Sequence, residues 1–241
     1  MKVSIVVPAY NEEKLLGGTL RGIGEAAQAF AGFGMEWELI VCDNNSTDRT
    51  AELARAAGAR VVFEPVNQIG RARNAGAAAA TGDWLLFIDA DSRPSAPLLA
   101  SVAEAIQSGG CLAGGSTVCV EDDHPVASFI TGVWNLISRI QKWAAGSFIF
   151  CQASAFRETG GFSTKFYASE ELELFLRLNR LARQRGKRIT ILHQHPLVTS
   201  ARKFHLYTPW EHLRFLVRTA LQFGRPLRSR EGCPIWYDGR R

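Results

Sequence analysis

Three kinds of segment are missing from this sequence, and each absence excludes a class of protein. No hydrophobic run approaches the roughly 18 to 20 residues that span a membrane, and the first apolar run ends at Pro8, too early for a signal-peptide core. The 5 cysteines are scattered without a CxxC pair, which argues against a zinc site and a disulfide framework. Low-complexity stretches and internal repeats are absent as well. We therefore expect a cytoplasmic protein, soluble or associated with the inner face of the cell membrane, with reduced core cysteines.

Glycine-rich phosphate loops are missing too. No GxGxxG follows the first apolar strand, which argues against a Rossmann dinucleotide site, and the chain has no Walker loop. A nucleotidyltransferase is disfavoured for a related reason, because its lysine-containing phosphate loop should also follow that strand. Any nucleotide must therefore be held by other residues.

Positive charge is scarce in the first three quarters of the chain and concentrated in the last. Residues 1–176 carry 13 Lys and Arg against 20 Asp and Glu, whereas residues 177–241 carry 15 against 3. A basic final quarter predicts an anionic partner, such as a membrane surface, a diphosphate or an acidic acceptor. Nucleic acid is not expected, because this region contains no nucleic-acid-binding motif.

The first hundred residues alternate between strand and helix patterns. Apolar β-branched runs predict strands over 3–7, 37–42, 60–63 and 84–88, and helical spacing predicts helices over 16–30, 47–57 and 69–80. Strands and helices that alternate through short connections predict right-handed βαβ units and a mostly parallel sheet flanked by helices. The fold class is therefore α/β.

The second half has a looser pattern, without a visible linker. We expect helices over 94–108, 125–143, 170–185 and 208–223, and strands over 111–120, 147–151 and 188–192. The helix from residue 208 follows a capping-box spacing with proline at its first position. The whole chain, 1–241, is expected to be one domain, with a regular half over 1–120, an irregular half over 121–205, and a basic helix and tail over 206–241.

Polar residues gather where the predicted strands end. Residues 8–12 follow the first strand, residues 43–48 the second, and Asp89 and Asp91 the fourth. In open α/β sheets, ligands bind beyond the carboxyl ends of the strands. Two carboxylates one residue apart are suited to hold a divalent cation beside a phosphorylated ligand. Aspartates that serve only a turn are the alternative.

Four segments in this order resemble the family 2 glycosyltransferases, which have the GT-A fold. They are VSIVVPAYNEE, VCDNNSTDRT, GRARNAGAAAATGDWLLFIDADS and the later GGFS…SEELEL. The similarity covers roughly residues 1–180, and LVTSARKF near the end is similar to small bacterial members. The resemblance implies a GT-A type fold with a Rossmann-like nucleotide-sugar-binding half over 1–120 and an acceptor half over 121–205.

The resemblance also implies a site for a nucleotide diphosphate sugar, UDP- or GDP-linked. Asp43 would pair with an N–H group of the base, and Glu12 would lie near the ribose. The expected donor-binding residues are Pro8, Ala9, Tyr10, Glu12, Asp43, Arg73, Asn74, Asp89, Ala90 and Asp91. Arg73 is included because the N-terminus of a helix favours anions. An exposed arginine without a ligand is the alternative for the nearby Arg71.

A divalent cation, Mn²⁺ or Mg²⁺, is the cofactor that this resemblance implies. Asp91 is the expected direct ligand. His195 is a further candidate, because a histidine from this late region completes the metal shell in some GT-A enzymes and neutral imidazole is suited to that. A structural role is the alternative for this histidine. Arg202 and Lys203 are expected to close over the diphosphate.

The catalytic base is expected among the acidic residues at the start of the 170–185 helix. Glu171 shares a helical face with apolar residues and is predicted to point inward, whereas Glu173 shares a face with arginines. Glu171 is therefore the first candidate and Glu170 the second. The family usually has Asp at the position of Glu171, so this chain departs from it by one methylene. Acidic residues also favour helix N-termini without any catalytic role.

These observations favour a metal-dependent inverting glycosyltransferase. Its acceptor is unidentified, and a lipid-linked molecule or a cell-envelope glycan is the candidate. The basic C-terminal region would supply a peripheral membrane contact. The alternative is a nucleotide-sugar-binding protein with weak or no transfer activity, and the Glu at the usual Asp position is the feature that favours it.

Overall fold

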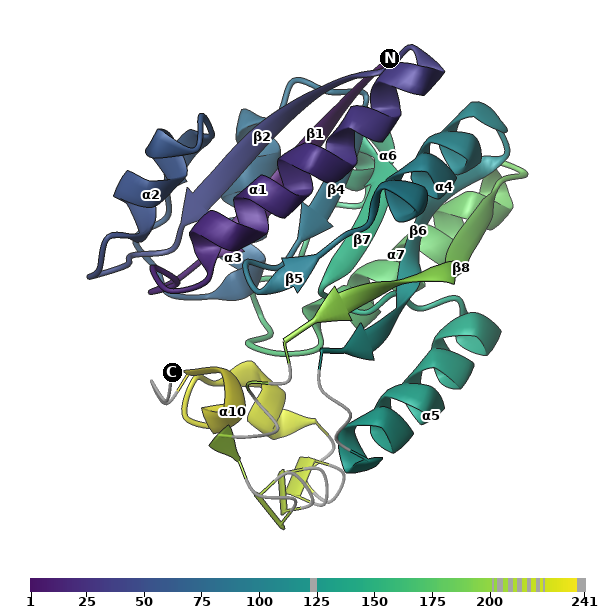
Figure 1. Cartoon of the computed structure of the whole chain (residues 1–241). Coiled ribbons are helices and arrows are strands. Elements are labelled where there is room, and N and C mark those ends of the chain that lie inside the picture. Colours follow the sequence, from purple (N-terminus) through teal and green to yellow (C-terminus); the bar gives the residue numbers. More distant parts are fainter. Residues whose placement is uncertain are drawn as a thin grey trace.

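The computed structural model describes residues 1–121, 125–200 and 224–237, together with positions 202, 206, 207, 210, 211, 214, 215, 218, 219 and 222. Strands and helices alternate along the first half (Figure 1). The strands are β1 (Lys2–Ala9), β2 (Glu36–Asp43), β3 (Arg60–Phe63), β4 (Trp84–Ile88), β5 (Ser92–Arg93), β6 (Cys111–Val120), β7 (Phe148–Gln152) and β8 (Arg188–Thr199). The α-helices are α1 (Leu16–Ala27), α2 (Thr50–Ala56), α3 (Ile69–Ala79), α4 (Ala96–Gln107), α5 (Pro125–Gln141), α6 (Ala153–Glu158), α7 (Glu170–Gln184) and α10 (Pro234–Tyr237), and the 3-10 helices are η1 (Gln28–Phe33) and η2 (Arg225–Arg228).

One eight-stranded sheet runs in the order β3-β2-β1-β4-β7-β6-β8-β5. Strands β1 to β4 pair in parallel, and β6 pairs in parallel with β8. Strand β7 lies between these two groups and is antiparallel to both β4 and β6. Its first residue, Phe148, therefore pairs with Ile88, the last residue of β4. The segment before β7 is thereby brought to the carboxyl end of β4, where the Asp89 N–H donates to the Ser147 carbonyl at 3.2 Å.

A hydrophobic cluster covers each face of the sheet. In β1, Ile5 and Val7 pack in a cluster with α1, η1 and α4, whereas Val6 belongs to the cluster on the opposite face with α6 and α7. This alternation follows from the two-residue period of a strand. Figure 1 shows α1 and α4 in front of the sheet and α6 and α7 behind it.

Helix α3 approaches β1 closely because it presents a glycine to the strand. A Cβ atom built on Gly76 would lie closer than 3.0 Å to a methyl group of the fully buried Val6. Glycine therefore permits a contact that any larger residue would prevent. The close contact fixes α3 against β1, and the carboxyl end of β1 lies at the edge of the sheet where ligands bind in open α/β folds.

The predicted α/β fold with a mostly parallel sheet is confirmed, and so are the predicted strands and helices of the first half. Four elements were not expected, namely β5 in the first half and α6, η2 and α10 later in the chain. Strand β8 also continues to Thr199 instead of ending at 192. The 208–223 helix falls largely outside the residues that the structure describes. Within the described part of the chain, no helix combines the length and the apolar character that a membrane span needs.

Candidate functional site

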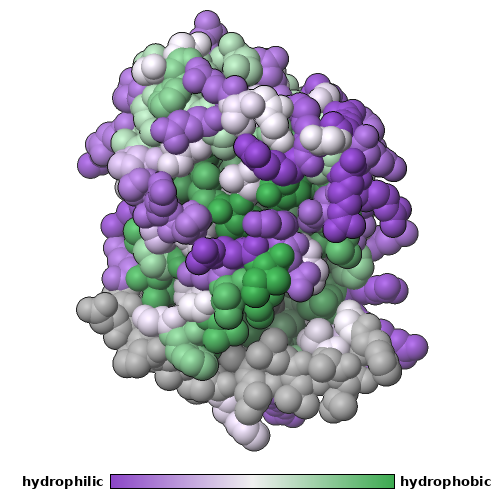
Figure 2. Space-filling model, turned by 90° about the vertical axis from the view of Figure 1, so that its right-hand side faces the viewer, coloured by the Kyte–Doolittle hydropathy of each residue, from purple (hydrophilic) through white to green (hydrophobic). Residues whose placement is uncertain are grey.

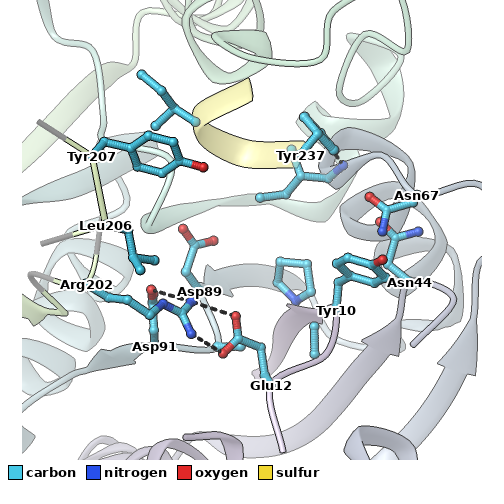
Figure 3. A pocket seen from close by; sticks show the side chains of 15 residues that line it. Tyr10, Glu12, Asn44, Asn67, Asp89, Asp91, Arg202, Leu206, Tyr207 and Tyr237 are labelled. Carbon is cyan, nitrogen blue, oxygen red and sulfur yellow. Dashed lines mark hydrogen bonds and ion pairs between the residues drawn. The ribbon is translucent and has the colours of Figure 1, made fainter. Parts of the chain in front are cut away.

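A cleft lies at the carboxyl ends of β1, β2 and β4 (Figure 3). Its volume is about 810 Å³, including solvent at its mouth. The residues that line it are Pro8, Ala9, Tyr10, Glu12, Asn44, Asn67, Ile69, Asp89, Ala90, Asp91, Arg202, Leu206, Tyr207, Ile235 and Tyr237. Seven of the ten predicted donor-binding residues are among them. The sequence prediction and the geometry therefore place the candidate site at the same rim of the sheet.

Glu12 and Asp91 are joined across the floor of the cleft by one arginine. The Arg202 guanidinium donates to both carboxylate oxygens of Glu12, at 2.8 and 3.0 Å, and its Nη2 lies 3.5 Å from Asp91 Oδ2. The hydrogen bonds that Arg202 donates to Glu12 raise the pKa of Arg202. Two acidic residues from β1 and β4 and a cation from the C-terminal segment thus meet at one point, as Figure 3 shows.

Arg73 lies beneath the cleft and does not line it. Its side chain is almost fully buried, and the guanidinium donates to Glu170 Oε1 at 2.6 Å, to Asp89 Oδ1 at 2.9 Å and to the Gly146 carbonyl at 2.8 Å. It also stacks over the Phe162 ring. Arg73 therefore connects the first aspartate of the Asp89–Asp91 pair to the acidic end of α7, a position that differs from the predicted direct contact with a nucleotide.

The two candidate bases differ in burial, and the order is the reverse of the predicted one. Glu170 is only 2% exposed, whereas Glu171 is half-buried. A Cβ built on Gly146 would lie 3.5 Å from the Glu171 carboxyl carbon and 3.2 Å from Arg73 Nη2, so Glu171 lies beside the same arginine. The helical-face argument turned Glu171 inward, where it lies half-buried beside Arg73, but it missed the deeper burial of Glu170, which shares a face with Leu174, four residues on.

The environment of Glu170 opposes its ionisation. Burial first, and then the neighbouring Glu171 carboxylate, raise the pKa of Glu170 to about 8, against the attraction of Arg73. Three carboxylates, those of Glu170, Glu171 and Asp89, share the field of one guanidinium. One cation cannot balance three buried or half-buried anions, so a proton retained on Glu170 is the physical expectation.

Two further predicted donor residues have structural partners. Asp43 is buried at the end of β2, where its Oδ1 accepts from the Ser46 N–H at 3.0 Å. Asn74 holds Phe162 through two backbone hydrogen bonds of 2.8 and 2.9 Å. Neither lines the cleft. Asn44, next to Asp43, does line it, with its side chain fixed by the carbonyls of Glu64 and Val66.

The C-terminal part of the cleft was not found from the sequence. Leu206, Tyr207, Ile235 and Tyr237 form this part of the lining, and Figure 3 shows Tyr207 and Tyr237 across the cleft from Glu12 and Asp91. The Tyr237 hydroxyl accepts from the N–H of Ile69, the first residue of α3, at 3.2 Å. Only the SARKF stretch gave a signal for this region, through Arg202. This part of the lining depends on contacts between residues about 170 positions apart, which no local pattern encodes.

The structure does not bring the late histidines to the cleft. His193 and His195 are exposed on β8 and do not line the cavity. Lys203, expected beside Arg202, lies outside the described residues. The catalytic candidates Glu170 and Glu171 also lie off the cavity lining, on the side of Asp89 that faces α7.

A divalent cation fits this donor set only together with a ligand. Asp89 and Asp91 present carboxylate oxygens, which Mg²⁺ and Mn²⁺ accept. Across the ranges for which side chains are described, no three residues of the His, Cys, Asp and Glu types gather in a way that would hold an ion. A cation bound by one or two carboxylates takes its remaining ligands from phosphates and water. The site is therefore suited to a metal that arrives with a phosphorylated ligand.

The sequence matches one family model and several curated proteins. Residues 4–171 match the family model described as "Glycosyl transferase family 2". The dolichol-phosphate mannosyltransferase of Pyrococcus furiosus is 32% identical over 124 residues, which are 48% of this chain and 33% of that protein. The glucosyl-3-phosphoglycerate synthase of Mycolicibacterium smegmatis is 39% identical over 97 residues, 37% of this chain and 30% of that protein. The chain thus spans at most about half the length of these curated relatives.

Solved structures show the same fold at low sequence identity. Residues 1–349 of S. aureus TarS in complex with UDP superpose with a TM-score of 0.64 at 23% identity, over 85% of this chain and 62% of that one. The glucosyl-3-phosphoglycerate synthase of Mycobacterium tuberculosis, in complex with Mn²⁺, UDP and glucosyl-3-phosphoglycerate, gives 0.62 at 21% identity, over 91% and 77%. The predicted GT-A type fold is confirmed by these neighbours.

Proposed function

The chain belongs to glycosyl transferase family 2 and is a glycosyltransferase, and we propose that it is a metal-dependent, inverting enzyme that uses a nucleotide diphosphate sugar. The observation that carries the proposal is the meeting of Glu12, Asp91 and Arg202 at the floor of a cleft that Asp89 also lines. Opposite charges held close together at a cleft floor suit a diphosphate with its counter-ion. UDP is favoured as the nucleotide because the similar S. aureus TarS structure contains it; GDP is the second candidate.

The donor would lie along the cleft from β1 to β4. Pro8, Ala9 and Tyr10 form the wall against which a base can pack, and Asn44, whose amide donates to the Val66 carbonyl, lines the same cleft. The diphosphate would then reach Asp91 and Arg202. Arg202 would exchange part of its ion pair with Glu12 for the diphosphate, since arginine binds phosphate oxygens in the same two-pronged way.

Asp91, with Asp89 beside it, would hold the divalent cation. When bound, the cation supplies neutralisation of the negative charge that develops on the leaving diphosphate. Arg202 lies at the same place and contributes positive charge by itself. His195 is not needed for this arrangement, and its exposed position on β8 gives no support to the ligand role proposed for it from the sequence.

Glu171 is the proposed base. Its carboxylate would take the proton from an acceptor hydroxyl while that oxygen bonds to the anomeric carbon, and the bond from that carbon to the diphosphate breaks. Attack from the face opposite the leaving group inverts the anomeric centre. Glu170 is less suited because its carboxylate is buried against Arg73 and favours the protonated form. It serves instead to position Arg73 and through it Asp89.

The acceptor is proposed to be a lipid-linked molecule or a cell-envelope glycan, with the enzyme on the cytoplasmic side of the membrane. The basic residues after position 177 support an anionic partner. A nucleotide-sugar-binding protein without transfer activity is the competing proposal. Substitutions of Asp91 and Glu171 distinguish the two proposals, because sugar transfer and nucleotide binding should respond differently to them.

The first test is thermal stability with UDP, GDP, CDP, dTDP and their sugars, with and without Mn²⁺ or Mg²⁺. A ligand at a hundredfold over its dissociation constant adds about 2.7 kcal/mol, which for a chain of this size is a shift of roughly 5 to 10 °C. We expect a metal-dependent shift with one base. Absence of a shift with every nucleotide would refute the donor site.

The second test separates binding from catalysis. Asp91→Asn should remove the metal-dependent part of the shift, because a neutral amide is a poor ligand for a hard cation. Glu171→Gln should keep the shift and lower the rate of sugar transfer by about 100-fold or more. Glu158→Gln, an exposed change on α6, serves as the control. Wild-type transfer by Glu171→Gln would show that another residue is the base.

A further inference from the structure

Helix α5 carries its large hydrophobic residues on the side that faces away from the protein. The exposed fractions of Phe129, Leu136 and Ile140 are 73%, 59% and 66%. Ile130, Val133 and Ile137 are exposed by 44%, 45% and 39%. Figure 2 views the side of the molecule on which α5 lies, and hydrophobic side chains gather in the lower half of that face, directly above the grey atoms. These six residues form the apolar face of α5.

The protein holds this helix by its polar side. Thr131 and Ser138 are buried, and Asn135 makes two hydrogen bonds to the Val118 backbone in β6, at 2.8 and 2.9 Å. The Ser138 hydroxyl donates to the Trp143 carbonyl at 2.6 Å and closes the end of the helix. A helix at a protein surface usually shows the opposite orientation, with apolar residues inward. The inverted orientation indicates that something else covers the apolar face.

The apolar face is wide. At 100° per residue, its six members span an arc of about 120° over the described turns of the helix. The seam that one partner helix covers in a two-stranded coiled coil is narrower than this. A helix that lies in the surface of a bilayer buries a broad arc in this way, with its polar side directed to water or protein.

Charge distinguishes the kind of partner. Residues 125–143 contain Arg139 and Lys142 and no acidic residue, and both cations are exposed at the C-terminal end of the helix. Glu121 and two aspartates precede the helix, so attraction to an anion belongs to its C-terminal end.

We propose that α5 lies in the surface of an anionic lipid bilayer, with its apolar face in the acyl boundary and Arg139 and Lys142 at the headgroups. Juxtaposed apolar and cationic residues match the two attractions that such a surface offers. This surface is distinct from the C-terminal region proposed above as a membrane contact. The inference does not depend on the proposed sugar transfer, because it uses no residue of the cleft.

The position of α5 connects the bilayer to the cleft. After Gln141 the chain returns through Trp143 to Gly146, whose carbonyl accepts from Arg73, and to Ser147, whose carbonyl accepts from the Asp89 N–H. A helix seated in the lipid would hold this segment within a few residues of the bilayer surface. A substrate with a lipid tail could then reach the Asp89 side of the cleft without leaving the membrane.

The experiment is flotation of the full chain with vesicles. Vesicles of phosphatidylcholine with phosphatidylglycerol are compared with vesicles of phosphatidylcholine alone. We expect binding to the anionic vesicles, and we expect the triple variant Phe129→Ser, Leu136→Ser, Ile140→Ser to bind at least about a hundredfold more weakly. Arg139→Gln with Lys142→Asn should weaken binding about fivefold for each charge removed, and added salt should act in the same direction.

The matched control is Phe63→Ser, which removes an equally large side chain, 58% exposed on β3, far along the sheet from α5. It should leave vesicle binding unchanged, and circular dichroism checks that each variant is folded. Equal loss in the control and the triple variant would overturn the proposal. So would absence of wild-type binding to anionic vesicles. A wild-type dimer that the triple variant converts to a monomer, without vesicle binding, would assign the apolar face to a second copy of the chain.

Discussion

At the scale of single residues, Arg73 organises the candidate site without lining it. Its guanidinium reaches Asp89 on one side and Glu170 on the other, so a change at either carboxylate is transmitted to the other through one side chain. Because Glu170 is buried and faces two more carboxylates, its protonation is linked to folding. The pH dependence of stability is therefore a direct report on this cluster.

The sign of that dependence follows from the direction of the shift. The pKa of Glu170 rises from 4.5 to about 8 on folding, so between these values the folded state binds more protons than the unfolded state. The stability that this proton contributes is fully present below pH 4.5 and is lost as the pH rises through 8. The loss from one group is at most about 1.4 kcal/mol per pH unit.

We expect Glu170→Gln to remove this dependence. Urea unfolding of the wild type and the variant is measured at pH 5.5, 6.5 and 7.5. As the pH rises, the free energy of unfolding of the wild type should fall relative to that of the variant. Glu158→Gln, whose carboxylate is exposed, should run parallel to the wild type. Parallel curves for Glu170→Gln as well would show that Glu170 is ionised throughout this range.

The sequence predicted the location of the polar residues at this rim better than it predicted their roles. Asp89, Asp91 and Glu12 were found because they follow strands, and strand ends are visible in the sequence. Arg73 was found for its place at the start of a helix, yet its burial depends on Asp89 and Glu170, 16 and 97 positions away. Hydrogen-bond partners at such separations are set by tertiary packing, which the local pattern does not contain.

At the scale of elements, the contact between α3 and β1 sets the shape of the rim. Gly76→Ala would place a methyl group against Val6, and buried overpacking of this kind costs about 1 to 3 kcal/mol. We expect this loss in urea unfolding, although alanine is the better helix former by about 1 kcal/mol. Val6→Ala should reduce the effect of Gly76→Ala, since it removes the colliding methyl group.

Gly24→Ala in α1 is the matched control, because nothing lies within 4 Å of a Cβ at that position. Helix propensity alone acts there, so a gain of up to about 1 kcal/mol is expected. We therefore expect Gly76→Ala to lower the free energy of unfolding and Gly24→Ala to raise it. A gain at Gly76 would show that Val6 and α3 move apart at little cost.

Elements with a clear period were predicted, and those without one were missed. β1 and β4 are continuous apolar runs, and α4 and α7 have helical spacing, so each was located within a few residues. β5 has only two residues and exists because Ser92 and Arg93 pair with Thr199 and Val198. Pairing with β6 and β5 also continues β8 past the proline at 196 to Thr199.

At the scale of the whole molecule, the C-terminal segment completes a cleft that begins at the N-terminus. Tyr237 lines the cavity and also packs edge-on against Tyr167, with ring centroids 5.4 Å apart. If the cleft binds a nucleotide, Tyr237→Ala should weaken that binding by about tenfold, because an aromatic wall is lost. Isothermal titration calorimetry with UDP and Mn²⁺ measures the change.

Tyr167→Ala separates this role from a structural one. It removes the same ring contact but no residue of the cleft lining, so nucleotide affinity should stay near the wild-type value. Equal losses in the two variants would mean that Tyr237 acts only through packing. The division into halves at residues 120 and 205 stays a prediction, although the C-terminal part of the lining makes the last part of the chain a contributor to the donor side.

The reversed direction of β7 has a consequence for how such an enzyme can be altered. Because β7 starts where β4 ends, the stretch from 121 to 147 leaves the sheet and comes back at the same edge, beside Asp89. Its length can therefore change while its two attachment points, β6 and β7, remain paired. If this stretch contacts the acceptor, as the predicted acceptor half implies, its exchange between related enzymes would change the acceptor while the register of β1 and β4 is kept. Chimeras joined at Val120 and Phe148 are the natural starting point for changing the acceptor.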